Sequence, residues 1–200
     1  MNLILYAITV VIWGSTWIAI KLQLGEVAVE ASIIYRFTLA GLLFFAVLLV
    51  TRRLQRLSLL DHLFCLVQGC CLFCFNFYCF YLATGLISSG LVSVIFSLST
   101  IFNSLNQWLF FHQRPTVRVL LGAVVGLMGM AALFWVDLAT SQFSYQTLQG
   151  FLLAMAGTLF FSLGNMVSVR HQRNALKPPT TNAWGIVYGV SVMTLVALFQ

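Results

Sequence analysis

The segment LILYAITVVIWGSTWIAIKL, residues 3–22, decides the class of fold. It is mostly apolar, and a helix of about 20 such residues spans the hydrocarbon core of a bilayer. Between Trp13 and Trp17, however, residues 14–16 are small or polar, and Lys21 lies near the end of the run. We therefore predict a transmembrane helix whose middle needs a polar or close-packed neighbour.

Further apolar runs follow the first, joined by short connections. The 200 residues are 61% hydrophobic and 7% charged, with a mean hydropathy of +1.00; soluble domains carry about 25% charged residues. The runs are too long for strands and do not alternate apolar with polar residues. We predict an all-α, polytopic integral membrane protein in contact with lipid, with helices at residues 3–22, 31–50, 63–82, 86–111, 119–136, 149–169 and 182–199.

The basic residues gather on alternate loops. Eight of the ten lie on one side of the predicted helices: Arg52, Arg53, Arg56, Arg114, Arg118, Arg170, Arg173 and Lys177. Because loops rich in Lys and Arg stay in the cytoplasm, we predict a multi-pass protein of the inner or plasma membrane with a cytoplasmic N-terminus. The formal net charge of +6 is spread over loops without a basic helix, which argues against nucleic-acid binding.

A polar stripe runs along the fourth predicted helix. Its members follow one another at spacings of four, three, four and three residues, and they are Ser93, Ser97, Thr100, Ser104 and Gln107. Asn103 and Asn106 widen it. Amide and hydroxyl groups do not face lipid cheaply, so the stripe either bonds to other helices or lines a cavity. We interpret it as a cavity wall.

The candidate substrate-binding residues combine this stripe with polar and aromatic residues of other helices. They are Trp13, Ser15, Thr16, Trp17, Lys21, Arg36, Asn76, Ser97, Thr100, Asn103 and Asn165. Lys21 and Arg36 lie near the outer ends of their helices, where Arg36 either snorkels and pairs with Glu26 or Glu30 or attracts anions to the cavity mouth. No acidic residue lies within a predicted helix, and aromatic rings with amides favour a small zwitterion or aromatic metabolite as substrate. We predict no cofactor and no metal site.

Small residues give two further hypotheses. Gly122 and Gly126 form a G-x-x-x-G face, which predicts close helix packing inside the protein or in a homodimer, and Gly14 would allow a helix or substrate to approach closely. Cys71 and Cys74 form a C-x-x-C pair; we interpret it as helix packing, with a membrane thiol oxidoreductase as the alternative.

The sixth run resembles the first when shifted by 150 residues, which places Gly14 on Gly164 and Ser15 on Asn165. A repeat unit of five helices reverses the direction of the sixth helix, so the repeat is inverted, as in many secondary transporters. We therefore expect a second repeat that is incomplete in this sequence. The expected units are 1–136, the first five-helix repeat, and 149–200, the start of the second.

Five stretches in order resemble the EamA-like branch of the drug/metabolite transporter superfamily. They are WGSTW (13–17), YRFTLAGLLF (35–44), FYLATGLISSGLVSVIFSLSTIFNSL (80–105), LFFHQRPTVRVLLGAVVGLMGM (109–130) and GFLLAMAGTLFFSLGNMVSVR (150–170). The resemblance implies ten helices in two inverted five-helix repeats around a central cavity. It also implies export or exchange of small metabolites, such as amino acids, by alternating access.

The sequence departs from the family pattern at two places. Thr100 stands where the family often has a proline, which predicts a straighter fourth helix. Residues 111–113 stand where it often has Leu-Gly-Glu, so a cytoplasmic acid is missing.

Three alternatives to a transporter remain open. A seven-helix receptor fits the number of helices but conflicts with a cytoplasmic N-terminus. A thiol oxidoreductase would use Cys71 and Cys74. A non-functional fragment of a transporter is the third.

Overall fold

The computed structural model describes residues 2–25, 27–139 and 144–199. Each of the predicted apolar runs is helical, which confirms the all-α membrane architecture. The helices are α1 (Asn2–Gln23), α2 (Val29–Val50), α3 (Leu59–Gly69), the π-helix η1 (Cys70–Phe75), α4 (Asn76–Leu86), α5 (Ser89–Ser97), α6 (Ser99–Phe111), α7 (Val117–Ala139), α8 (Tyr145–Arg173) and α9 (Pro178–Leu198). Among the described residues, six helical segments are long and apolar enough to cross a membrane, and Val117–Ala132 is a shorter apolar helix.

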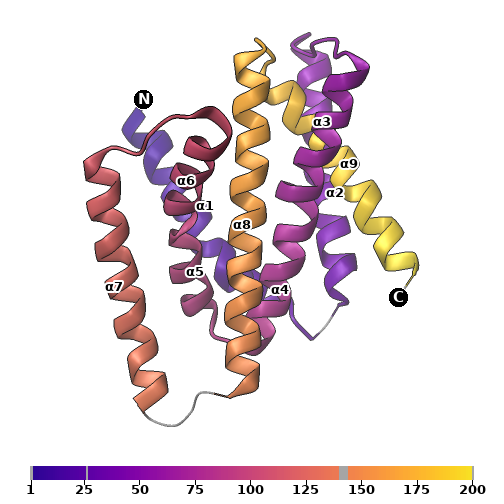
Figure 1. Cartoon of the computed structure of the whole chain (residues 1–200). Helices are drawn as coiled ribbons and strands as arrows, with labels where there is room; N and C mark the ends of the chain where they lie inside the picture. The colour runs from indigo at the N-terminus through magenta and orange to yellow at the C-terminus, as the bar shows by residue number, and fades with distance from the viewer. Residues whose placement is uncertain (1, 26, 140–143, 200) are drawn as a thin grey trace.

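The connections that carry the basic residues lie at one end of the bundle. Figure 1 shows the α2–α3, α6–α7 and α8–α9 connections together at the top, with the N-terminus at the same end. The α4–α5 connection lies at the opposite end, and the chain finishes α9 on its way there. We call these the basic end and the opposite end.

Side-chain caps begin several helices. Ser58 and Asp61 form a capping box at the start of α3, in which each side chain bonds to the backbone of the other residue. Ser88 accepts from the amide of Leu91 to begin α5, and Ser144 caps α8 in the same way. These caps satisfy amide groups that have no partner within the first turn of a helix.

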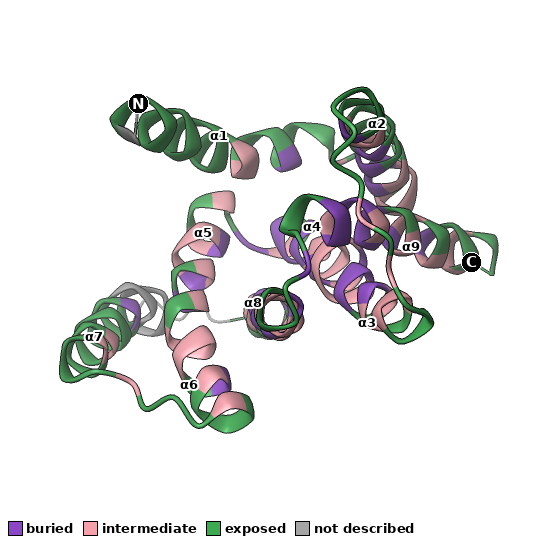
Figure 2. Ribbon diagram, turned by 90° about the horizontal axis from the view of Figure 1, so that it is seen from above, coloured by how far each residue is buried: buried purple, intermediate pink, exposed green. Residues whose placement is uncertain are grey.

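Helix α8 is the centre of the bundle. Figure 2 shows it between α3 and α4 on one side and α5 and α6 on the other. Its face toward η1 and α4 contains small residues: a Cβ added at Gly157 would lie 2.9 Å from the Phe80 ring of α4, and one at Gly164 would lie 2.5 Å from Cγ of Leu72 in η1. Small residues at these positions let the helices approach closely, which is the main source of packing energy in lipid.

The shortest approach between helices joins α3 and α9. A Cβ added at Gly69 would collide with the carbonyl oxygen of Gly185 and lie 2.9 Å from the amide nitrogen of Gly189. The π-helix η1 begins at the next residue, Cys70, so the helix changes its winding where it leaves this contact. The contact holds α9 against the middle of the third membrane segment.

The fourth membrane segment is interrupted at Leu98, although Thr100 replaces the proline of the family. The amide of Leu98 donates to the carbonyl of Ile95, three residues back, at 3.0 Å. The hydroxyl of Ser97 bonds to the carbonyl of Val94 at 2.6 Å. Serine hydroxyls that bond back to their own helix favour bending, so the missing proline does not leave this segment continuous.

The glycines chosen from sequence do not pack against neighbouring helices. A Cβ added at Gly14, Gly122 or Gly126 would meet nothing within 4 Å. Helix α7, which carries two of them, lies at the edge of the bundle and packs mainly on α5 and α6 (Figures 1 and 2). The prediction of close packing at these glycines inside the chain is therefore wrong, and the close contacts lie on α3, α8 and α9.

Replacing Gly69 with alanine tests the α3–α9 contact. Because the new Cβ meets backbone rather than a movable side chain, we expect Gly69→Ala to destabilise the protein by about 1–3 kcal/mol. The measurement is the thermal unfolding midpoint of the purified protein in detergent. Gly122→Ala is the matched control, since its Cβ enters open space; equal midpoints for the two variants would contradict the assignment.

Candidate functional site

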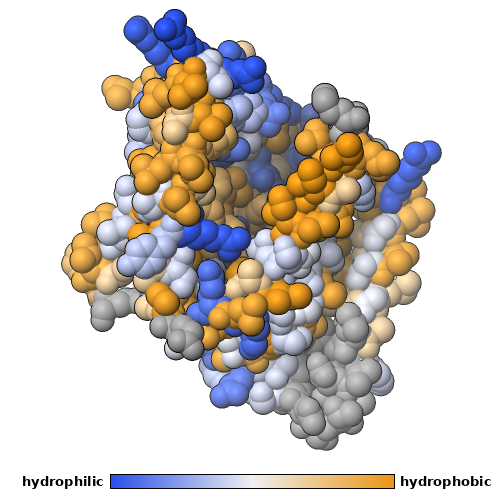
Figure 3. Space-filling model, turned by 180° about the vertical axis from the view of Figure 1, so that it is seen from behind, coloured by the Kyte–Doolittle hydropathy of each residue, from blue (hydrophilic) through white to orange (hydrophobic). Residues whose placement is uncertain are grey.

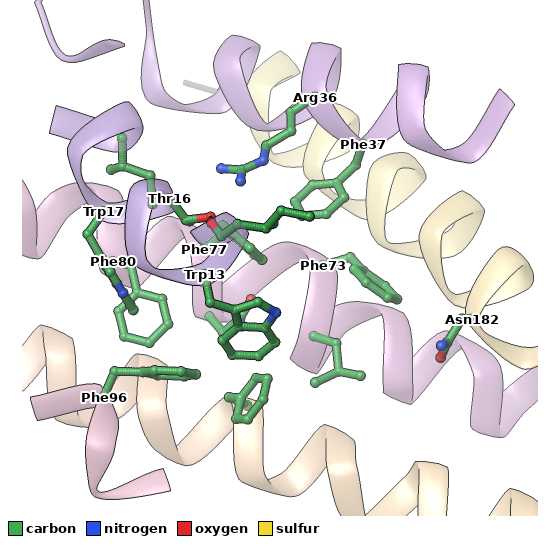
Figure 4. A pocket seen from close by; sticks show the side chains of 15 residues that line it. Trp13, Thr16, Trp17, Arg36, Phe37, Phe73, Phe77, Phe80, Phe96 and Asn182 are labelled. Atoms are coloured by element: carbon green, nitrogen blue, oxygen red, sulfur yellow. The ribbon is translucent and has the colours of Figure 1, made fainter. Parts of the chain in front are cut away.

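A cavity of about 370 Å³ lies between α1, α2, α4 and α8. Figure 4 shows aromatic side chains surrounding it, with Arg36 entering from α2 and Asn182 from α9. The lining residues are Ile12, Trp13, Thr16, Trp17, Ile20, Arg36, Phe37, Leu72, Phe73, Asn76, Phe77, Phe80, Phe96, Phe161 and Asn182. We call this space the aromatic cavity.

One face of α1 forms a wall of the aromatic cavity. Its lining residues lie three to four positions apart, which brings them onto the same side of a helix. The Trp17 ring lies 5.2 Å from the rings of both Phe80 and Phe96, and it packs on each of the two buried hydrophobic clusters of the bundle. The Trp13 ring lies 5.7 Å from that of Phe96. Edge-to-face and tilted contacts of this kind fix the positions of the rings.

The polar groups of the aromatic cavity are few. Arg36 is half-buried, and its guanidinium carbon lies 5.1 Å from the centre of the Phe77 ring. Asn76 is 2% exposed, and its side-chain oxygen has no hydrogen-bond partner among the described residues. Asn182 accepts a hydrogen bond of 2.8 Å from the buried Gln68.

A second hollow adjoins the aromatic cavity on the side of the opposite end, where it lies between the last turns of α1 and the first turns of α2. It has a volume of about 660 Å³, and we call it the vestibule. Figure 3 shows the rear face of the molecule, which is hollowed in its upper half, toward the basic end. The vestibule is lined by Ala19, Leu22, Gln23, Val27, Ser32, Tyr35, Arg36 and Leu39. Arg36 lines both hollows, and neither lining includes an acidic residue among the described residues.

Five of the candidate residues predicted from sequence meet at the aromatic cavity: Trp13, Thr16, Trp17, Arg36 and Asn76. The others do not line it. Ser15 bonds to the carbonyl of Val11 in its own helix, and Lys21 donates to the carbonyl of Thr84 at 3.1 Å, which ties α1 to α4.

The polar stripe of the fourth segment also lies away from the aromatic cavity. Asn103 accepts a hydrogen bond of 3.3 Å from Asn165, and Asn106 donates to Ser162 at 2.8 Å. Ser97 bonds to its own helix, and Thr100 is exposed. The asparagines therefore hold α6 against α8, which is the packing role considered for them, and not the cavity wall that we favoured.

Arg36 has no acidic partner among the described residues. Among the described residues, the ion pair is that between Arg170 and Asp61, at 3.1 Å, and it lies near the basic end. Glu26, one of the two partners considered from sequence, lies outside the described residues, and Glu30 makes no ion pair with Arg36. The guanidinium is instead held over the Phe77 ring, a contact worth about 0.5–2 kcal/mol.

Sequence reasoning missed most of the aromatic lining. The missed aromatic residues are Phe37, Phe73, Phe80, Phe96 and Phe161, and the polar Asn182 was missed as well. The chain has 18 phenylalanines, so their presence in apolar helices carried little positional signal. Asn182 is the first residue of the last helix predicted from the sequence, so nothing marked it as part of a cavity. In the structure, the contact between α3 and α9 brings it beside Gln68.

The five cysteines are free thiols in the structure. Cys71 and Cys74 lie within η1, and Cys74 packs in the hydrophobic cluster with Ile33, Phe37 and Tyr81. These surroundings agree with the packing interpretation of the C-x-x-C pair.

Comparison with known proteins agrees with the resemblance seen in the motifs. The profile of the EamA-like transporter family matches residues 1–135. A protein of Archaeoglobus fulgidus, named as an uncharacterized transporter, is 28% identical over 158 residues, which are 78% of this chain and 53% of that protein. The chain thus spans about half the length of this relative. No solved structure matches the chain. Because the family profile matches the chain from α1 into α7, the chain belongs to the EamA-like transporter family.

Proposed function

We propose that this protein carries small organic metabolites, such as amino acids or related compounds, across the cell membrane. The observation that carries the proposal is the aromatic cavity, whose volume of about 370 Å³ lies in the range of small-molecule sites. A lining of rings with a few polar groups favours a substrate with an apolar body and a polar head. Membership of the EamA-like family supports transport as the activity.

The proposed mechanism is alternating access around the aromatic cavity. The units at 1–136 and 149–200 are the first inverted repeat and the start of the second, and rocking of one against the other would expose the cavity to each side in turn. Helix α8 contributes Phe161 and α9 contributes Asn182, so both proposed units supply lining residues. Relative movement of the units therefore changes the shape of the site itself.

The proposed orientation places the N-terminus and the basic end in the cytoplasm. Arginine and lysine on the α2–α3, α6–α7 and α8–α9 connections support it through the positive-inside rule. The vestibule then lies on the outer side, at the ends of α1 and α2.

Removing the Trp17 ring tests whether the aromatic cavity is the transport site. We expect Trp17→Ala to lower the initial rate of efflux of labelled phenylalanine from preloaded vesicles by about tenfold or more, because a buried aromatic anchor of a binding site typically contributes about 2 kcal/mol. Trp108→Ala is the control, since Trp108 is 53% exposed and lies outside the cavity. Thermal midpoints verify that both variants fold; a Trp17→Ala rate equal to that of the native protein would exclude the cavity as the route.

Labelling of single introduced cysteines tests the orientation. We expect Gln146→Cys, at the opposite end, to react with a membrane-impermeant maleimide on intact cells. Arg53→Cys, at the basic end, should react only after the cells are opened, because the reagent does not cross the membrane. Labelling of the native protein measures the background reaction of its five own cysteines. Labelling of Arg53→Cys on intact cells would reverse the proposed orientation.

A further inference from the structure

We propose that Arg36 and Asn76 form a two-point polar site that selects organic anions carrying an N–H donor and an apolar body. This inference rests on the proposed function, because it names the class of substrate that the aromatic cavity takes. It assigns the negative group of the substrate to Arg36 and its N–H group to the side-chain oxygen of Asn76.

Arg36 gives the cavity a single sign of charge. Its guanidinium lies among phenylalanine rings, at 5.1 Å from Phe77 and 6.0 Å from Phe37, and no carboxylate of the described residues pairs with it. A charged group in such surroundings gains strongly from an opposite charge, and a guanidinium can bind a carboxylate with two parallel hydrogen bonds. A cationic substrate would meet repulsion without a compensating acid.

Asn76 supplies the second point. It is 2% exposed, it lines the cavity, and its side-chain oxygen accepts no hydrogen bond from the described residues. Leaving a buried acceptor without a partner costs about 1–3 kcal/mol, which a substrate donor would recover. Asn76 directly precedes Phe77 on α4, and the Arg36 guanidinium lies 5.1 Å from the centre of the Phe77 ring, so both polar residues border the part of the cavity that Phe77 lines.

Arg36 also lines the vestibule, so it lies at the junction of the two hollows. An anion entering or leaving through the vestibule meets this guanidinium before or after it occupies the aromatic cavity. The same residue therefore sets the charge preference of the passage and of the binding site.

Binding of matched probes to the protein in lipid nanodiscs tests the charge preference. Hippurate carries a benzene ring, an amide N–H and a carboxylate; methyl hippurate keeps the ring and the N–H but is neutral; N-(2-aminoethyl)benzamide keeps both and is a cation. We expect calorimetry to show hippurate binding about tenfold more tightly than either, since hydrogen bonds to charged groups have this strength. Empty nanodiscs correct for partition into lipid.

Variants of Arg36 test whether this residue causes the preference for the anionic probe. Arg36→Gln should abolish the difference among the three probes, and Arg36→Lys should keep part of it. Arg53→Gln is the control, because it removes the same charge from an exposed loop at the basic end. An unchanged preference in Arg36→Gln, or native binding of the cation or the ester as tight as that of hippurate, would overturn the inference.

A fourth probe tests the Asn76 contact. 3-Benzoylpropionate replaces the amide N–H of hippurate with CH₂, and we expect it to bind about fivefold more weakly to the native protein. Asn76→Leu should remove this difference by weakening hippurate alone. If Asn76→Leu does not fold, the two probes on the native protein still decide, since equal affinities would exclude the contact.

These measurements are independent of transport. Anion-selective binding without efflux of any probe would retain the site and refute the proposed function. Efflux of phenylalanine by a protein that binds the anionic, the neutral and the cationic probe equally would retain the function and overturn the inference.

Discussion

The arrangement of the bundle depends on one close contact between backbones, where Gly69 of α3 meets Gly185 and Gly189 of α9. In lipid, apolar side chains gain little from leaving their surroundings, so packing at short range and polar contacts must hold helices together. At this crossing the two backbones approach without intervening side chains. The Phe73 ring, one turn farther along η1, then packs on Gly185 and enters the aromatic cavity. The position of α9, and with it the place of Asn182 beside Gln68, follows from that approach.

Polar side chains in the membrane divide into two groups by whether the protein itself satisfies them. Asn103 with Asn165, and Asn106 with Ser162, complete hydrogen bonds across the α6–α8 contact. Asn76 of α4 also faces α8, where a Cβ added at Gly157 would lie 3.1 Å from its backbone oxygen, yet its side-chain oxygen has no hydrogen-bond partner among the described residues. Similar chemistry thus stabilises the bundle at one level and leaves a buried acceptor without a partner among the described residues at another.

Hydropathy and loop charge were sufficient to predict the helices, because a bilayer requires long apolar segments whatever their packing. Trp13, Thr16 and Trp17 were predictable candidates because one turn of one helix brings them to the same face. Arg36 and Asn76 stood out as charged or amide groups in apolar runs. The phenylalanines of the lining did not, since an apolar helix gives no contrast between the side that faces lipid and the side that faces a cavity.

The incorrect predictions have a common physical cause. A G-x-x-x-G pattern or a polar stripe describes one helix, whereas packing needs a second surface that is distant in the sequence. Gly185 and Gly189 form the same G-x-x-x-G pattern as Gly122 and Gly126, but among the described residues only the first pair meets a close neighbour, Gly69 of α3, and the pattern itself does not tell the two pairs apart. The hydrogen bonds of Asn103 and Asn106 likewise depend on α8, more than fifty residues away.

The uneven attachment of α1 determines how that helix can move. Near the opposite end Lys21 bonds to the carbonyl of Thr84, Gln23 bonds to the hydroxyl of Tyr81, and Ile20 is fully buried. Toward the basic end, residues 3–15 are all exposed. A helix that is fixed at one end and makes few contacts at the other can pivot about its fixed end. Swinging the free arm of α1 therefore strains few contacts, while it carries Trp13 farther from Phe96 than it carries Trp17, and so widens the cavity toward the basic end.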